Sequence, residues 1–147
     1  MRNKKIRKIS LFLTLVVSMT FLFSSVSLAA STIKYYNASF ILQPTYHSYW
    51  EGQVHLDVSA DADGIEAIIK FQKLGTDSLG KPVWQTVKTD REHSYRVGYT
   101  NVINANKNMI ITTDGTYRAQ VVISTYDEKK DLLETVTWTS EQIVHKK

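Results

Sequence analysis

The chain has 147 residues, enough for one domain, and it contains no cysteine. The absence of cysteine excludes a disulfide framework, a thiolate metal site and a cysteine nucleophile, so the fold must be stabilised by an apolar core. The first eight residues hold five of the 18 Lys and Arg residues, and the other 13 face 14 Asp and Glu residues. Without that basic segment the net charge is about −1 and the charges are interspersed, so we predict no nucleic-acid binding.

The N-terminal segment has the order of an export signal. The basic residues precede an apolar run, Ile9–Phe23, and small residues follow it, among them Ser27, Ala29 and Ala30. Small side chains at the first and third residues of the Ser27–Ala29 triplet fit the pocket of a signal peptidase. We therefore expect cleavage after Ala29, with Ala30 as the first residue of the mature chain.

This division predicts a signal-peptide helix over residues 1–29 and a β domain over residues 30–147. The mature chain is expected to be extracellular or associated with the cell wall, and to meet the membrane only through its leader. The alternative is an uncleaved N-terminal anchor, because residues 9–30 are long enough to span a bilayer.

Two-residue alternation of apolar and polar side chains predicts strands in the first half of the mature chain. The clearest strand is Trp50–Ala60, whose alternation indicates an antiparallel sheet with one buried and one solvated face. A further strand, Lys34–Leu42, precedes it. The turn residues Asp61–Gly64 follow it, and the next strand is Ile65–Leu74.

The second half of the chain is expected to form shorter strands. They are Val83–Thr89, Tyr95–Tyr99, Met109–Thr112, Tyr117–Ile123 and Leu132–Ser140. We expect a loop at Gly75–Pro82 and a second one at Asn101–Lys107, which is rich in Asn and shows little alternation. Asp127–Asp131 is expected to be a charged hairpin tip.

Seven or eight short strands without intervening helices predict an all-β protein, because no segment beyond the leader has apolar residues at helical spacing. We expect an antiparallel sandwich of Greek-key type. The alternative is an up-and-down barrel with an internal ligand cavity.

Four short sequence segments from Ile65 onward follow one another in an order that is typical of a known class of β module. They are Phe71–Lys73, Trp84 with Val87, Asp114–Arg118, and Glu134–Thr137. This order resembles an immunoglobulin-like or fibronectin type III-like module of small secreted proteins of Gram-positive bacteria. The resemblance covers about half of the chain and implies an immunoglobulin-like β-sandwich. It also implies a tyrosine corner at Tyr117, in which the ring packs in the core and the hydroxyl bonds to upstream backbone.

The polar residues indicate no catalytic, metal or cofactor site. The four histidines are scattered without ligand spacing, and Asp61–Gly64 resembles a calcium loop but lacks its later ligands. No nucleophile motif appears, so we expect a protein that is not an enzyme. The spacing of Tyr95 and Tyr99 is similar to the haem-ligating segment of NEAT haem-uptake domains, but two tyrosines facing the core also explain it.

Aromatic residues are the most suggestive feature of the sequence. An exposed patch is predicted from Tyr35, Tyr36, Tyr46 and Tyr49, because exposed rings can stack on sugars or anchor a protein partner. We therefore expect a monomeric module that binds an extracellular protein or glycan. One alternative is a carbohydrate or cell-wall binding module. The other is a small bacteriocin-like or membrane-active protein, suggested by size, export and amphipathic strands.

Overall fold

The computed structural model describes residues 30–45 and 49–146, and this part of the chain contains eight strands and no helix. The strands are β1 (Ile33–Pro44), β2 (Trp50–Asp61), β3 (Gly64–Thr76), β4 (Pro82–Tyr95), β5 (Thr100–Ile111), β6 (Gly115–Tyr126), β7 (Leu132–Thr139) and β8 (Ile143–His145). The predicted leader, residues 1–29, lies outside the described residues.

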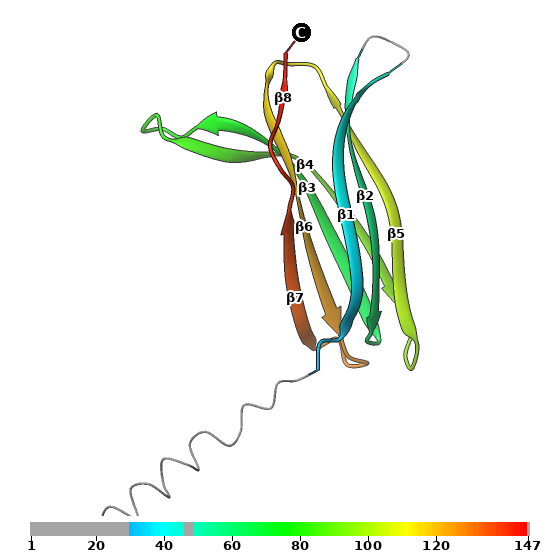
Figure 1. Ribbon diagram of the computed structural model, residues 1–147. Helices are drawn as coiled ribbons and strands as arrows, with labels where there is room; N and C mark the ends of the chain where they lie inside the picture. Colours follow the sequence, from blue (N-terminus) through cyan, green and yellow to red (C-terminus); the bar gives the residue numbers. More distant parts are fainter. Residues whose placement is uncertain (1–29, 46–48, 147) are drawn as a thin grey trace, which may run out of the picture. The chain divides into compact units, whose positions relative to one another are not determined.

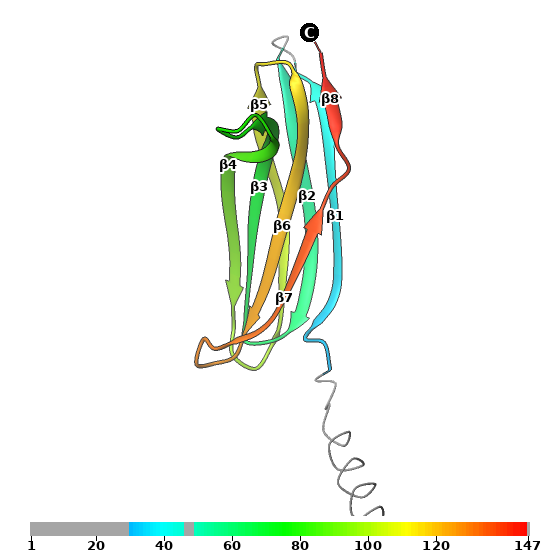
Figure 2. The ribbon, with the colours of Figure 1, turned by 90° about the vertical axis from the view of Figure 1, so that its left-hand side faces the viewer.

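The strands form two antiparallel sheets that face each other (Figures 1 and 2). A three-stranded sheet has the order β1-β2-β5, and a five-stranded sheet has the order β4-β3-β6-β7 with β8 also paired to β6. The chain crosses between the sheets after β2, after β4 and after β5. Two separate sheets confirm the predicted antiparallel sandwich of seven or eight strands rather than a closed barrel.

The core lies between the sheets, where alternate residues of the central strands point inward. The alternation predicted for β2 is confirmed, since Val54, Leu56 and Val58 are almost fully buried. On the opposite sheet, β3 and β6 supply the apolar residues Ile65, Ala67, Ile69, Phe71, Tyr117, Ala119, Val121 and Ile123. Phe71 meets Phe40 of β1 edge-to-face, with 6.2 Å between the ring centroids, and so joins the two sheets.

Two predicted boundaries around residue 100 are wrong. The strand predicted at Tyr95–Tyr99 does not form, because β4 continues to Tyr95 and the following residues turn back toward β5. Asp63 holds this turn. Its carbonyl accepts the N–H of Arg96, and its carboxylate accepts the N–H of Gly98, whose φ is 76°. Tyr95 and Tyr99 therefore do not lie together on a strand, as a haem-ligating pair would require.

The Asn-rich segment predicted as a loop is instead the middle of β5. Ile103 and Ala105 face the core, while Asn104 and Asn106 lie on the solvated face. Asn101 is buried, and its amide donates to three backbone carbonyls, those of Ala62, Arg96 and Tyr99. An Asn-rich segment can therefore form a strand here, because its other asparagines lie on the outer face and the buried amide of Asn101 is fully hydrogen-bonded.

Polar groups close the side of the sandwich where β4 faces β5. Lys107 of β5 forms an ion pair with Glu92 of β4. Lys88 of β4 donates to the carbonyl of Asn108 at 2.6 Å and lies 3.0 Å from the carboxylate of Asp90. The hydrogen bond to Glu92 is the main cause that raises the pKa of Lys107. Charged side chains therefore point inward along this edge.

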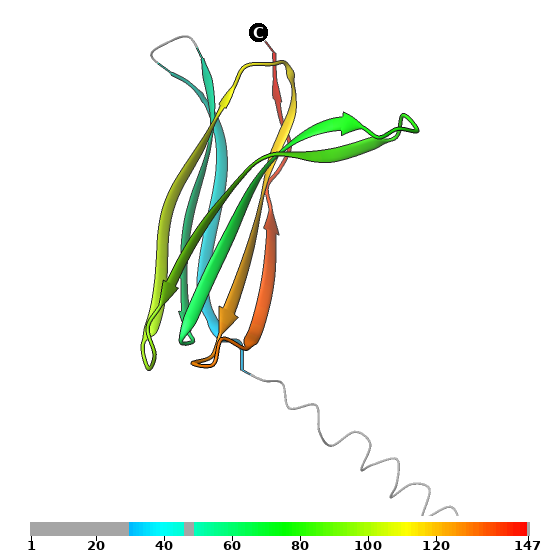
Figure 3. The same ribbon diagram turned by 180° about the vertical axis from the view of Figure 1, so that it is seen from behind.

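The distal part of the β3–β4 hairpin projects from the sandwich (Figures 1 and 3). A tight turn, Asp77–Lys81, ends it within the segment predicted as a loop. Where the hairpin leaves the sheet, the guanidinium of Arg118 stacks on the ring of Trp84, 4.1 Å from its centroid, and donates to Gln72. Burial lowers the pKa of Arg118.

Candidate functional site

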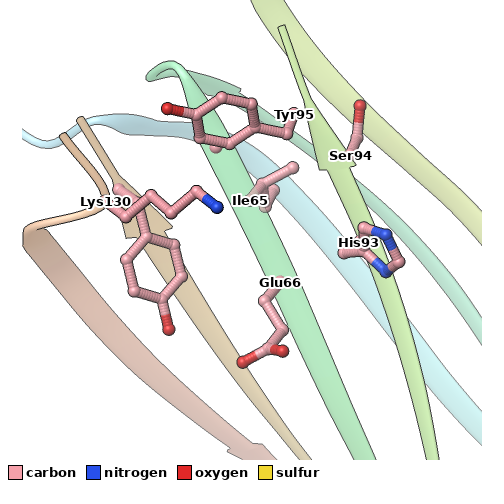
Figure 4. Close-up of a pocket in the computed structure, with 8 residues that line it drawn as sticks. Ile65, Glu66, His93, Ser94, Tyr95 and Lys130 are labelled. Carbon is pink, nitrogen blue, oxygen red and sulfur yellow. The ribbon is translucent and has the colours of Figure 1, made fainter. Parts of the chain in front are cut away.

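A groove of about 470 Å³ lies on the outer face of the five-stranded sheet (Figure 4). It is lined by Gly64, Ile65, Glu66, His93, Ser94, Tyr95, Tyr126 and Lys130. The register explains why distant residues meet here, because Gly64 of β3 pairs with Tyr95 of β4 on one side and with Tyr126 of β6 on the other. Glu66 and His93 form the next outward-facing pair. Lys130 comes from the β6–β7 turn.

The ring of Tyr95 rests on a glycine. A Cβ atom at Gly64 would lie 2.6 Å from Cδ2 of Tyr95, so any side chain there would displace the ring. The hydroxyl of Tyr95 donates to the carbonyl of Glu128 at 2.5 Å, which fixes the far end of the ring. Partial burial, together with the charges of Asp63, Asp127 and Glu128, raises the pKa of Tyr95. Tyr95 is thus a rigid platform with 41% of its surface exposed.

Polar side chains surround this platform. Figure 4 shows Lys130 on one side of the groove and His93 on the other, with Glu66 between them. The carboxylate of Glu66 lies 3.3 Å from Nε of Arg91, which partly neutralises it. The Nζ atom of Lys130 lies 5.8 Å from the centroid of the Tyr95 ring. The groove therefore offers one fixed aromatic face and several hydrogen-bonding groups.

The structure does not gather the predicted aromatic patch into one surface. Tyr35 and Tyr36 are exposed at the start of β1, whereas Tyr49 is exposed just before β2, and Tyr46 lies outside the described residues. Tyr35 pairs with Ser59, and Pro44, at the other end of β1, pairs with the residue that follows Tyr49. Nine residues of strand separate these ends by about 30 Å.

Tyr117 lies apart from the groove, in the core. Its side chain is 3% exposed, and its hydroxyl donates to the carbonyl of Thr113, four residues upstream, at 2.8 Å. Lys73 lies over its ring, with Nζ 5.6 Å from the centroid. This is the arrangement that the resemblance to immunoglobulin-like modules implies for a tyrosine corner.

The described histidines are dispersed. His55 bonds to Asn106 at 2.7 Å and to Asp57 at 2.9 Å on the outer face of the three-stranded sheet, and these bonds raise its pKa. His145 is buried beside Trp50, with 5.2 Å between ring centroids. His93 lines the groove, and His47 lies outside the described residues. Within residues 30–45 and 49–146, no group of three His, Asp or Glu side chains is placed to hold a metal ion.

Sequence reasoning missed the groove because its residues come from three strands and a turn that are far apart in the chain. Gly64 had a visible signal, since it follows Asp63 in a turn motif, but a turn glycine does not indicate that a ring lies over it. The sequence predicts Tyr95 at the start of a strand, Tyr95–Tyr99, that does not form.

No helix in the described part of the chain is long and apolar enough to cross a membrane. Comparison of the chain with protein-family models, with curated proteins and with solved structures finds no match.

Proposed function

We propose that this chain is an exported, non-catalytic module that binds a carbohydrate, such as a cell-wall glycan, in the groove around Tyr95. The observation that carries the proposal is the fixed ring of Tyr95 resting on Gly64 and surrounded by polar side chains. Export follows from the predicted leader and its cleavage after Ala29.

The groove suits a sugar because a sugar ring has an apolar face and a rim of hydroxyl groups. An exposed aromatic ring offers the apolar face a stacking surface, and nearby polar groups supply hydrogen bonds to the hydroxyls. Glu66 can accept such bonds, and His93 can donate or accept them. Because Tyr95 is held at both ends, little side-chain entropy is lost when a ligand binds.

Binding is favoured over glycoside hydrolysis by the acids that line the groove. Hydrolysis generally uses two carboxyl groups on opposite sides of the scissile bond. Glu66 is the one carboxylate among the residues that line this groove, and it forms an ion pair with Arg91. A single carboxylate without a second one across the groove suits hydrogen bonding to a ligand better than this two-carboxyl chemistry.

Retention of the purified protein on insoluble peptidoglycan and on a glycan array tests this proposal. We expect wild-type protein to be retained, and Tyr95→Ala to reduce retention at least tenfold by removing the stacking surface. Gly64→Ala is expected to act similarly, because its Cβ displaces the ring. Tyr99→Ala is the matched control, since Tyr99 is 70% exposed and does not line the groove.

Equal retention of Tyr95→Ala and wild type, or no retention on any glycan, would overturn the proposal. Circular dichroism of each variant checks that loss of binding is not loss of fold. If glycans fail to retain the protein but it releases dye from lipid vesicles, the membrane-active alternative is favoured instead.

A further inference from the structure

Two hairpin turns in this protein have the same hydrogen-bond pattern. In Asp77–Lys81, Asp77 pairs with Lys81 through the backbone, and its carboxylate accepts the N–H groups of Leu79 and Lys81, each at 2.8 Å. In Asp127–Asp131, Asp127 pairs with Asp131, and its carboxylate accepts the N–H groups of Lys129 and Asp131 at 2.9 and 2.8 Å. The fourth residue of each turn donates its N–H to the carbonyl of the first.

The fourth residue differs between the two turns. Gly80 occupies it in the first turn with φ of 76°, and Lys130 occupies it in the second with φ of 69°. Three-residue hairpin loops of this kind place that residue in the left-handed region, where glycine is free of strain and a residue with a Cβ is not. Lys130 is the one non-glycine residue with positive φ in the described part of the chain.

The strain at Lys130 coincides with a position in the groove. Gly80 lies at an exposed tip where a Cβ would meet nothing within 4 Å, whereas the side chain of Lys130 lines the groove beside Tyr95. Within residues 30–45 and 49–146, the ammonium group of Lys130 forms no ion pair, so the fold gains no salt bridge from it. Backbone strain at a binding surface is a sign of a functional constraint.

We propose that Lys130 is kept in this strained position because its ammonium group binds an oxyanion, a carboxylate or a phosphate, on an acidic glycan held in the groove. This inference rests on the proposed function and names its ligand class. Two carboxylates of this region already have other partners, because Glu66 is paired with Arg91 and the carboxylate of Asp127 accepts two N–H groups within its own turn. An ammonium group has three donors and no acceptor, which suits an oxyanion.

The Lys130→Gly variant separates the two roles of the residue. Relief of strain is expected to raise the thermal unfolding temperature by about 2–5 °C. Loss of the ammonium group is expected to reduce retention on an acidic glycan at least fivefold, while retention on a neutral glycan stays within twofold. The reverse change in the matching turn, Gly80→Lys, is expected to lower the unfolding temperature by a similar amount without changing retention.

Lys129→Gln is the matched charge control, because Lys129 lies in the same turn and does not line the groove. The probes are polygalacturonate, which carries carboxylates, a polyglycerol phosphate polymer, and dextran as the neutral glycan. Whichever acidic polymer loses retention in Lys130→Gly identifies the oxyanion.

The inference is overturned if Lys130→Gly lowers the unfolding temperature, or if this variant retains both acidic polymers as well as wild type does. Retention of wild type on dextran but on neither acidic polymer would also overturn it, yet leave the proposed function standing. Failure of every glycan to retain wild type would contradict the proposed function itself.

Discussion

Tyr117 contributes to the fold through both ends of its side chain. The ring is buried between the sheets, and the hydroxyl donates to the carbonyl of Thr113 just before β6. The loop between β5 and β6 is thereby tied to the core by one side chain. At the scale of single residues, stability depends on such fixed polar contacts as much as on apolar area, because an unpaired buried group is costly.

The Tyr117→Phe variant tests this contact. It keeps the ring but removes the hydroxyl, so the bond to the Thr113 carbonyl is lost, and we expect the free energy of unfolding to fall by about 1 kcal/mol. Urea denaturation measures the change. Tyr36→Phe serves as the control. Tyr36 is 42% exposed, so loss of its hydroxyl group should lower the free energy of unfolding by less than about 0.5 kcal/mol. An equal cost for the two variants would contradict a structural role for the Tyr117 hydroxyl.

At the scale of elements, a single carboxylate fastens the start of β1 to β7. Glu134 accepts hydrogen bonds from the side chain of Ser31, from the backbone and side chain of Thr32, and from the N–H of Ile33. Burial alone would raise the pKa of Glu134, but these hydrogen bonds outweigh it and hold the pKa below its ordinary value. The two sheets are thus joined at one end through the first residues of the β domain.

This lowered pKa predicts a loss of stability in acid. A depressed carboxylate pKa contributes stability above the ordinary value, about 4.3, and that contribution disappears as the pH falls through the folded pKa. We expect Glu134→Gln to lower the unfolding temperature at pH 7, and the difference from wild type to shrink as the pH falls below the ordinary carboxyl pKa and the wild-type carboxyl takes up a proton. Thermal melts of both proteins from pH 3 to pH 7 measure this. An unchanged difference across that range would contradict the charged clamp.

The predictability of each element depended on how its polar residues are distributed. Strands β2 and β6 alternate cleanly, because one face meets only apolar neighbours and the other meets water, and they were predicted closely. Strand β4 was predicted only over Val83–Thr89, because its inward residues Lys88, Asp90 and Glu92 are charged and hide the alternation beyond it. The groove could not be predicted, because cross-strand register, and not local sequence, brings Gly64 under Tyr95.

At the scale of the whole molecule, the two sheets are held together by interdigitated apolar side chains. Phe71 is the largest fully buried side chain, and its edge-to-face contact with Phe40 spans the sheets. The free energy of unfolding of a domain of this size is roughly 5–15 kcal/mol. Burial of one large core side chain such as Phe71 therefore supplies a large share of it.

Phe71→Ala is therefore expected to reduce the free energy of unfolding by about 3–5 kcal/mol through the cavity that it leaves. Ile110→Ala, at a side chain that is 55% exposed on the outer face, is expected to cost less than about 1 kcal/mol. Urea unfolding followed by tryptophan fluorescence compares them. Similar costs for the two variants would show that the inter-sheet core is not the main source of stability.

The charged side of the sandwich also has a consequence for the protein at high concentration. Strand β4 is the edge of the five-stranded sheet, and an unprotected edge can recruit a strand from a neighbouring molecule. A strand added there would have to cover Lys88, Asp90 and Glu92 and strip water from them. That desolvation opposes sheet-to-sheet aggregation, so the charges that this edge directs inward protect a chain without disulfides from adding strands of its neighbours.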